Sequence, residues 1–163
     1  KLNGEKAIQL SGCKYIILRT AWVYSEYGSN FLTNMLKLGV HKDEISIVSD
    51  QIGSPTYAQD IAKSIVSIVS RLNIDESLSG IFHYCGDKSY SWYDFALAIF
   101  LEAEACGFKI PSSIMPITTA DYPTAAIRPA YSVLDCSKIE NCFGITRSNF
   151  RDGIKIAINK INI

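Results

Sequence analysis

The chain has 163 residues, of which 48% are hydrophobic and 20% charged, a composition that supports a packed core and argues against disorder. Sixteen basic side chains balance sixteen acidic ones, so the chain lacks the basic footprint of a nucleic-acid-binding protein. No apolar run approaches the roughly 20 residues needed to cross a bilayer, and we expect no membrane partner. Two histidines and five cysteines, none spaced as CxxC, predict reduced thiols in a cytoplasmic protein rather than a zinc site.

In chain order, the hydrophobic pattern predicts helices that alternate with short strands. Helix boundaries follow from N-capping residues such as Asn30 and Ser91, and from glycines that end helices, such as Gly12 and Gly107. The expected elements are a helix over 1–11, a strand over 15–20, a helix over 31–41, a strand over 45–49, a helix over 57–72, a strand over 80–86, a helix over 92–105, an extended piece over 113–117, and short helices over 135–143 and 149–161. Loops are expected over 21–28, 50–56 and 118–132.

Strands that alternate with helices predict an α/β fold with a mostly parallel sheet. Residues 15–20 and 81–84 have the apolar composition of fully buried strands. Two neighbouring strands do not form a stable parallel sheet, because such sheets are buried on both faces. The chain also begins at Lys1, without a methionine and inside a helical pattern. We therefore expect it to be part of a longer protein whose N-terminal residues supply the other strands.

The chain contains no complete catalytic motif. Its closest pair of glycines, Gly80 and Gly86, is six residues apart, so no glycine-rich loop is present to cradle a phosphate. Sequences of the types GxSxG, HExxH and Walker A are absent as well. The isolated chain is therefore expected to be inactive as an enzyme.

Five segments resemble one known family, and they occur in order: KLNGEKAI, ILRTAWVYSEYGSNF, VSDQIGSPTYAQDIA, GIFHYCG and TAAIRPAYSVLDCSKI. They are similar to the C-terminal part of the dTDP-4-dehydrorhamnose reductases, which are extended short-chain dehydrogenases/reductases. The resemblance implies a Rossmann-like NAD(P)-binding fold, in which residues 1–24 and about 57–90 supply sheet elements. Residues 25–56 and 91–163 would form mainly a small α/β substrate-binding region, and the N-terminal dinucleotide-binding half would be absent.

The same resemblance implies an activity for the parent protein. It would use NADPH, with NADH as an open alternative, to reduce dTDP-4-dehydro-L-rhamnose to dTDP-L-rhamnose for surface polysaccharide. The chain would supply the part that binds this dTDP-4-keto-6-deoxy sugar. A homodimer and a requirement for Mg²⁺ are compatible with the family, although no carboxylate cluster in the sequence lets a metal be assigned.

Lys1 resembles the lysine of the Tyr-x-x-x-Lys pair of this family, whose tyrosine would lie four positions before it. Residues four apart share a helix face. An ammonium near a phenol lowers the pKa of the phenol, which can then act as a general acid. The resemblance further implies that Lys1 holds the ribose hydroxyls of the nicotinamide cofactor. From the residues alone, an ordinary solvated lysine is the alternative.

Trp22 follows the end of a strand, which is where ligands bind in doubly wound sheets. The resemblance implies that Trp22 contacts the sugar through a flat apolar face and an N–H donor, with core packing as the alternative. Arg128 carries a guanidinium that suits a pyrophosphate. Asn30 and Gln51 are further candidates for the nucleotide, although helix capping would also explain Asn30. Arg19 stays open between a phosphate and a buried carboxylate.

Two other functions remain open from the sequence. The parent protein could be another nucleotide-sugar epimerase or reductase. It could also be a non-catalytic regulatory subunit similar to that of methionine adenosyltransferase. An intact upstream tyrosine, together with an active-site serine or threonine, would support catalysis, whereas loss of both would support a regulator.

Overall fold

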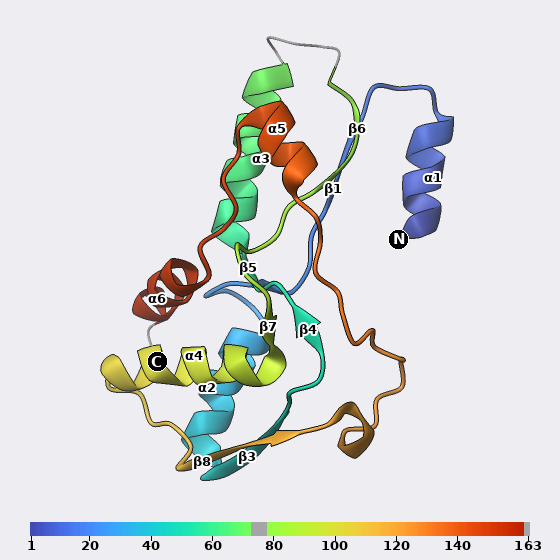
Figure 1. The fold of residues 1–163 in the computed structure, drawn as a ribbon. Helices are drawn as coiled ribbons and strands as arrows, with labels where there is room; N and C mark the ends of the chain where they lie inside the picture. Colours follow the sequence, from blue (N-terminus) through green and yellow to red (C-terminus); the bar gives the residue numbers. More distant parts are fainter. Residues whose placement is uncertain (73–77, 162–163) are drawn as a thin grey trace.

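The computed structural model describes residues 1–72 and 78–161 (Figure 1). The helices are α1 (Leu2–Leu10), α2 (Phe31–His41), α3 (Ala58–Leu72), α4 (Trp92–Ala105), the 3₁₀ helix η1 (Thr119–Asp121), α5 (Ser137–Phe143) and α6 (Phe150–Lys160). The strands are β1 (Ile16–Arg19), β2 (Val23–Tyr24), β3 (Glu44–Val48), β4 (Ile52–Gly53), β5 (Thr56–Tyr57), β6 (Gly80–His83), β7 (Tyr90–Ser91) and β8 (Ser113–Ile117). The α/β class predicted from the alternating pattern is confirmed.

The strands of the described residues form two-stranded pairs. Three pairs are parallel, namely β1 with β6, β2 with β5, and β3 with β8, whereas β4 and β7 are antiparallel. In the first pair, Ile16 lies opposite Gly80 and Arg19 opposite His83. The pairs β2–β5 and β4–β7 are two residues long in each strand, and they join segments that are far apart in the sequence.

Two hydrophobic clusters hold the elements together. The larger cluster packs α2, α4 and α6 around fully buried side chains such as Leu32, Phe95 and Ile154. The smaller cluster joins α3, β6 and α5 through Ile68, Phe82 and Ile139. Figure 1 shows the first group of helices in the lower part of the molecule, and α3 beside α5 in the upper part. Helix α5, from the 91–163 range expected to be mainly substrate-binding, thus packs with α3 and β6.

Capping residues set the two helix starts that matter for the site. Asn30 caps α2 by accepting a hydrogen bond from the backbone N–H of Thr33, whose hydroxyl accepts from the N–H of Asn30 in return. Ser91 and Asp94 form the same reciprocal arrangement at the start of α4. Both predicted N-caps are therefore confirmed, and α4 begins at Trp92.

Several expectations about strands were wrong. The predicted loop over 50–56 contains β4 and the first residue of β5; Gly53 ends β4, and Pro55 lies between the two strands, outside both pairings. Residues 15–20 and 81–84 were expected to be fully buried, but every residue of β1 is only half-buried. Within the described part of the chain β1 pairs with β6 alone, so its other edge has no neighbouring strand.

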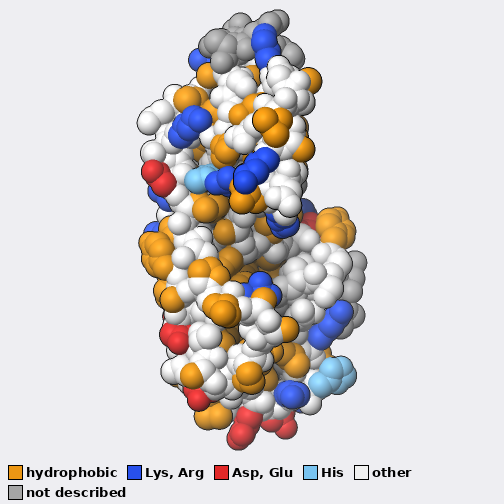
Figure 2. Space-filling view, turned by 90° about the vertical axis from the view of Figure 1, so that its right-hand side faces the viewer, with side chains coloured by type: hydrophobic (Ala, Val, Ile, Leu, Met, Phe, Trp, Pro, Cys, Tyr) orange, Lys and Arg blue, Asp and Glu red, His pale blue; other side chains and the backbone are white. Residues whose placement is uncertain are grey.

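Helix α1 lies apart from the two clusters, at the right of Figure 1. None of its residues is buried, and Leu2 and Leu10 are 56% and 86% exposed. Figure 2 turns the side of the molecule that carries α1 toward the viewer and shows hydrophobic side chains at the surface between Lys and Arg side chains. The packing of the described residues therefore does not depend on α1.

Candidate functional site

Trp22 lies directly after the carboxyl end of β1 and has an unusual backbone conformation. Its φ of 49° makes it the only residue other than glycine with a positive φ in ranges 1–72 and 78–161. A bulky L-residue in the left-handed region is strained, and such strain is typical of functional sites. The conformation is held by β2–β5 pairing, in which the N–H of Thr56 donates to the carbonyl of Trp22 at 3.1 Å.

The indole of Trp22 stacks on the indole of Trp92. The ring centroids lie 3.6 Å apart, with 6° between the planes. Gly53 also lies against the Trp22 ring, since a Cβ at that glycine would be 2.2 Å from Cε2 of Trp22. Trp22 is half-buried rather than part of the core. Protein therefore covers the indole in two places, with Trp92 on one face and Gly53 close to Cε2 and Nε1.

The two indoles differ in how their N–H groups are used. Nε1 of Trp92 donates to Oε1 of Gln51 at 3.2 Å. Nε1 of Trp22 makes no hydrogen bond with any residue that the structure describes. Trp22 is thus the indole of the pair whose N–H has no partner among the described residues, and its contact with a sugar hydroxyl stays a prediction.

Gln51 is 8% exposed, and it links the tryptophan pair to the segment 118–132. Its Nε2 donates to the hydroxyl of Thr119 at 3.1 Å. The backbone N–H and the hydroxyl of Thr119 both donate to Asp50, and these bonds, led by the one from the hydroxyl, hold the pKa of the Asp50 carboxyl below its usual value. Both amide atoms of Gln51 are thereby engaged within the protein, and a contact with the nucleotide stays a prediction.

The segment 118–132 is fastened at one end to the residues just before β4 and at the other end to β4 itself. Thr119 is held by Asp50 and Gln51 at one end, and at the other Ile52 donates its N–H to Ala130 and accepts from that of Ser132, both at 2.8 Å. Between these ends residues 120–131 are all exposed, and Arg128 lies among them. Arg128 has no hydrogen bond or ion pair with the residues that the structure describes. Its guanidinium is thus unpaired within the described residues, and its contact with a diphosphate stays a prediction.

Asn30 uses its whole amide to shape the loop that precedes α2. Besides capping the helix, its Nδ2 donates to the carbonyls of Ser25 at 2.9 Å and Tyr27 at 3.1 Å. The helix-capping interpretation is confirmed. A contact with a ligand stays a prediction, and it would have to replace one of these bonds.

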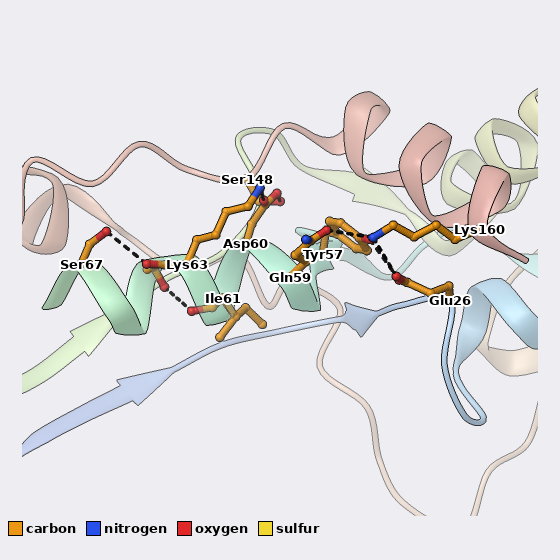
Figure 3. A network of polar contacts seen from close by, with 10 residues as sticks. Glu26, Tyr57, Gln59, Asp60, Ile61, Lys63, Ser67, Ser148 and Lys160 are labelled. Atoms are coloured by element: carbon orange, nitrogen blue, oxygen red, sulfur yellow. Dashed lines mark hydrogen bonds and ion pairs between the residues drawn. The ribbon is translucent and has the colours of Figure 1, made fainter. Parts of the chain in front are cut away.

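A polar cluster that the sequence did not predict ties the same loop to the C-terminal helix (Figure 3). Lys160 of α6 lies 3.1 Å from Oε1 of Glu26, 3.1 Å from Oε1 of Gln59 and 3.3 Å from the hydroxyl of Tyr57. The Tyr57 hydroxyl in turn donates to Oε2 of Glu26 at 3.0 Å. Burial acts to raise the pKa of Glu26, but hydrogen bonds from its own backbone amide, Lys160 and Tyr57 outweigh it, and the pKa is lowered. This cluster holds the loop 25–30 in place.

Figure 3 also shows that Asp60, in the first turn of α3, has structural partners. Its carboxylate accepts from Ser148 at 2.7 Å and from Lys63 at 3.0 Å. The Ser148 contact fastens the segment before α6 to α3. Asp60 therefore has a structural role, and its place in the first turn of α3 favours a carboxylate there.

Arg19 and Lys1 lie toward α1 rather than beside Trp22. Nε of Arg19 donates to both carboxylate oxygens of Glu5, at 3.1 and 3.2 Å, which settles Arg19 as the partner of a carboxylate. Lys1 is exposed at the start of α1. Two hollows, of about 430 and 530 Å³, lie on either side of α3, and neither is lined by Lys1 or Trp22. A joint role for Lys1 and Trp22 stays a prediction.

No metal centre is formed by the part of the chain that the structure describes, since no group of three or more His, Cys, Asp or Glu side chains is placed to hold an ion.

All five cysteines are free thiols. Cys85 and Cys136 are buried with their sulfurs 3.5 Å apart, and the hydrogen bond from Cys136 lowers the pKa of Cys85 to about 6. None of the described helices is both long and apolar enough to span a membrane.

Comparisons with known proteins agree on one family. The sequence model of the RmlD substrate binding domain matches residues 1–163. The dTDP-4-dehydrorhamnose reductase of Aggregatibacter actinomycetemcomitans is 45% identical over 158 residues, which are 95% of this chain and 53% of that protein.

Solved structures give the same result. A crystal structure of a dTDP-4-dehydrorhamnose reductase from Clostridium acetobutylicum superposes with a TM-score of 0.87 at 34% identity, over 100% of this chain and 54% of that chain. The reductase of Bacillus anthracis, in complex with NADP, gives 0.82 at 32% identity, over 99% and 54%. The chain thus spans about half the length of the relatives it matches, and the predicted C-terminal part of a Rossmann-like fold is confirmed.

Proposed function

Because the chain belongs to the RmlD substrate binding domain family, we propose that it forms the sugar-nucleotide-binding part of a cytoplasmic, NADPH-dependent dTDP-4-dehydrorhamnose reductase. When bound, the nicotinamide would supply the hydride that converts the C4 carbonyl of dTDP-4-dehydro-L-rhamnose to the alcohol of dTDP-L-rhamnose. The 45% identity to a reductase of that name supports this assignment. So does the NADP bound in the Bacillus anthracis relative.

The observation that carries the proposal is the placement of Trp22. It follows a strand end in a strained conformation, one face of its indole is fixed by Trp92, and its N–H is free of partners among the described residues. A hexose ring has apolar faces and hydroxyl groups, and an aromatic ring with a free donor suits both. Trp22 would therefore hold the sugar, and Arg128, on the exposed segment fastened to β4, would bind the diphosphate.

The chain's own contribution to the cofactor site is small. Lys1 is exposed and its ammonium fits the role of a donor to ribose hydroxyls. Its second proposed role is to lower the pKa of a tyrosine one helical turn before it, so that the phenol protonates the sugar oxygen. No glycine-rich phosphate loop is available in this sequence for the rest of the cofactor. The chain alone is therefore proposed to bind sugar nucleotide without turning it over.

Binding of nucleotides by isothermal titration calorimetry tests the proposal. We expect dTDP-L-rhamnose to bind more tightly than UDP-glucose, and Trp22→Ala to weaken it. Preference for UDP-glucose would support the epimerase alternative instead. Absence of binding of any sugar nucleotide by the full-length protein would support the regulatory-subunit alternative.

A turnover assay supplies the second test. The full-length protein with NADPH and the keto sugar should consume NADPH, whereas the 163-residue chain should not. Turnover by the chain alone would contradict its proposed role. A homodimer is part of the proposal, and sedimentation of the full-length protein at several concentrations checks it.

A further inference from the structure

Of the two stacked tryptophans, Trp92 is the one whose position the surrounding structure fixes more firmly. Trp92 is the first residue of α4, where the reciprocal hydrogen bonds of Ser91 and Asp94 fix the helix start. Antiparallel pairing of Gly53 with Tyr90 sets the position of the segment just before α4. Phe31 lies 4.6 Å from the Trp92 ring on another side. The backbone that carries Trp92 is therefore fixed by the helix start, and its ring contacts Phe31 and Trp22, whereas Trp22 has a strained backbone conformation.

The second feature is the hydrogen-bonded line from Trp92 through Gln51 to Thr119. Its two bonds are 3.2 and 3.1 Å long, and the buried amide of Gln51 donates one and accepts the other. The line connects the indole pair to the residue at which the exposed segment 120–131 begins. The stack and this line form one unit that joins the two proposed contact points for the ligand.

We propose that Trp92 and Gln51 are positioning residues for the sugar nucleotide. Trp92 fixes the plane of the Trp22 indole, and Gln51 holds the start of the Arg128 segment in register with that plane. This inference rests on the proposed function, in which Trp22 and Arg128 contact the ligand. Neither Trp92 nor Gln51 needs to touch the ligand itself.

The physical reason for this positioning role is the free energy that it costs to order flexible groups when a ligand binds. A side chain and a loop that are already fixed lose little freedom when a ligand binds, whereas free ones must be ordered at that moment. Loss of the unit should therefore weaken binding in the ground state and in the transition state alike. Such a loss raises KM and leaves kcat almost unchanged.

Three variants of the full-length protein test the inference. Trp92→Leu removes the stacking partner. Gln51→Glu keeps the acceptor for Trp92 but removes the donor to Thr119, whose hydroxyl already donates to Asp50. Tyr93→Phe is the matched control on the same helix, because the Tyr93 hydroxyl contacts only the carbonyl of Ile114, at 3.5 Å.

The first two variants should raise KM for the keto sugar and Kd for dTDP-L-rhamnose about tenfold, with kcat within about twofold, while the control changes neither. A spectroscopic readout accompanies the kinetics, because two indoles stacked at this distance couple in circular dichroism. Trp92→Leu should remove the couplet, and Gln51→Glu should keep it.

The outcomes separate this inference from the proposed function. If Trp22→Ala weakens binding but Trp92→Leu and Gln51→Glu do not, the positioning role is overturned and the proposed function stands. If Trp22→Ala binds as the wild type does, the proposed function itself fails. Should Trp92→Leu not fold, Gln51→Glu alone decides, and a fall in its kcat without a change in KM also overturns the inference.

Discussion

Gly53 and Trp22 are in such close contact that no side chain fits between them. A Cβ at Gly53 would lie 2.2 Å from Cε2 and 2.5 Å from Nε1 of the Trp22 indole. The contact explains why this position of β4 carries a glycine although its φ is not positive. It also makes the place of the indole sensitive to a single methyl group.

Gly53→Ala should displace the Trp22 indole and lower the free energy of unfolding by about 1–3 kcal/mol. Affinity for dTDP-L-rhamnose should fall together with stability, because the indole can no longer stack on Trp92. Urea unfolding and calorimetry measure the two effects. Gly4→Ala is the control, since a Cβ at Gly4 has nothing within 4 Å. If both variants lost the same free energy of unfolding, the structure would have made room for the Cβ at Gly53 and the prediction would be wrong.

Lys160→Met should destabilise the protein, because it removes the cation from the Glu26–Tyr57–Gln59 cluster. The side chain of Glu26 is 5% exposed, so its buried carboxylate would lose the ammonium of Lys160, whose own side chain is 42% exposed, at a cost of about 1–3 kcal/mol. Lys63→Met is the matched control: it removes the ion pair with Asp60, whose cation is 65% exposed, and should cost less than about 1 kcal/mol. Chemical denaturation measures both free energies of unfolding. If Lys160→Met and Lys63→Met lowered them equally, the cluster would not hold the loop 25–30 in place.

The ion pair of Glu26 and Lys160 makes the stability of the protein depend on pH, and the two pKa shifts give the sign of that dependence. The pKa of Glu26 is lowered from 4.5 in the folded protein, so its stabilising contribution is present above pH 4.5 and is lost as the pH falls through the lowered value. The pKa of Lys160 is raised from 10.5, first by the hydrogen bond to Glu26, so its contribution is present below pH 10.5 and is lost as the pH rises through the raised value. The stability difference between wild type and Lys160→Met should therefore be constant between these limits and shrink outside them. A difference that grows at low pH would contradict this assignment.

Asn30→Ala should remove the cap of α2 and the two bonds to the loop carbonyls. Loss of the cap costs about 0.5–2 kcal/mol, and the unpaired carbonyls add to that loss. Asn30→Asp keeps the capping oxygen but turns a carboxylate oxygen toward the carbonyls of Ser25 and Tyr27, so its cost reports the loop contacts and not the cap. Thermal unfolding of the two variants measures the difference. If Asn30→Asp binds dTDP-L-rhamnose with unchanged affinity, the predicted contact of this amide with the nucleotide is wrong.

Arg128→Gln should weaken the binding of dTDP without changing the fold. Arg128 is exposed and has no partner among the described residues, so its removal should change stability by less than about 0.5 kcal/mol. Loss of charge-assisted hydrogen bonds to the diphosphate should reduce affinity about tenfold or more. Arg71→Gln, at an exposed position near the end of α3, controls for net charge. Equal binding by both variants would remove Arg128 from the site.

The fold could be predicted where the signal is local. The stripes of apolar residues and the caps at Asn30 and Ser91 determine α2 and α4 within the sequence of each helix. The short strands β2, β4, β5 and β7 could not be predicted, because a two-residue pairing has no periodicity and depends on a partner elsewhere in the chain.

The candidate site, like the fold, could be predicted from local sequence signals but not where it depends on long-range contacts. The resemblance identified Trp22, but Trp92 was not among the expected site residues, because its stack on Trp22 depends on the pairing of β4 with β7. The sequence left Arg19 open between a phosphate and a carboxylate, since a strand residue does not reveal which side chain faces it. Glu5, on the preceding helix, is that partner. Long-range contacts decided both cases.

Helix α1 buries none of its nine residues, and the Glu5–Arg19 pair fastens it to β1. A helix this short is marginal in water without tertiary packing. Its amide protons should therefore exchange with solvent long before those of α4, whose inner face is fully enclosed. Lys1 is the N-cap of this helix, so the direction of its ammonium follows the order of α1, and a contact that covered Leu2 and Ile8 would fix both together.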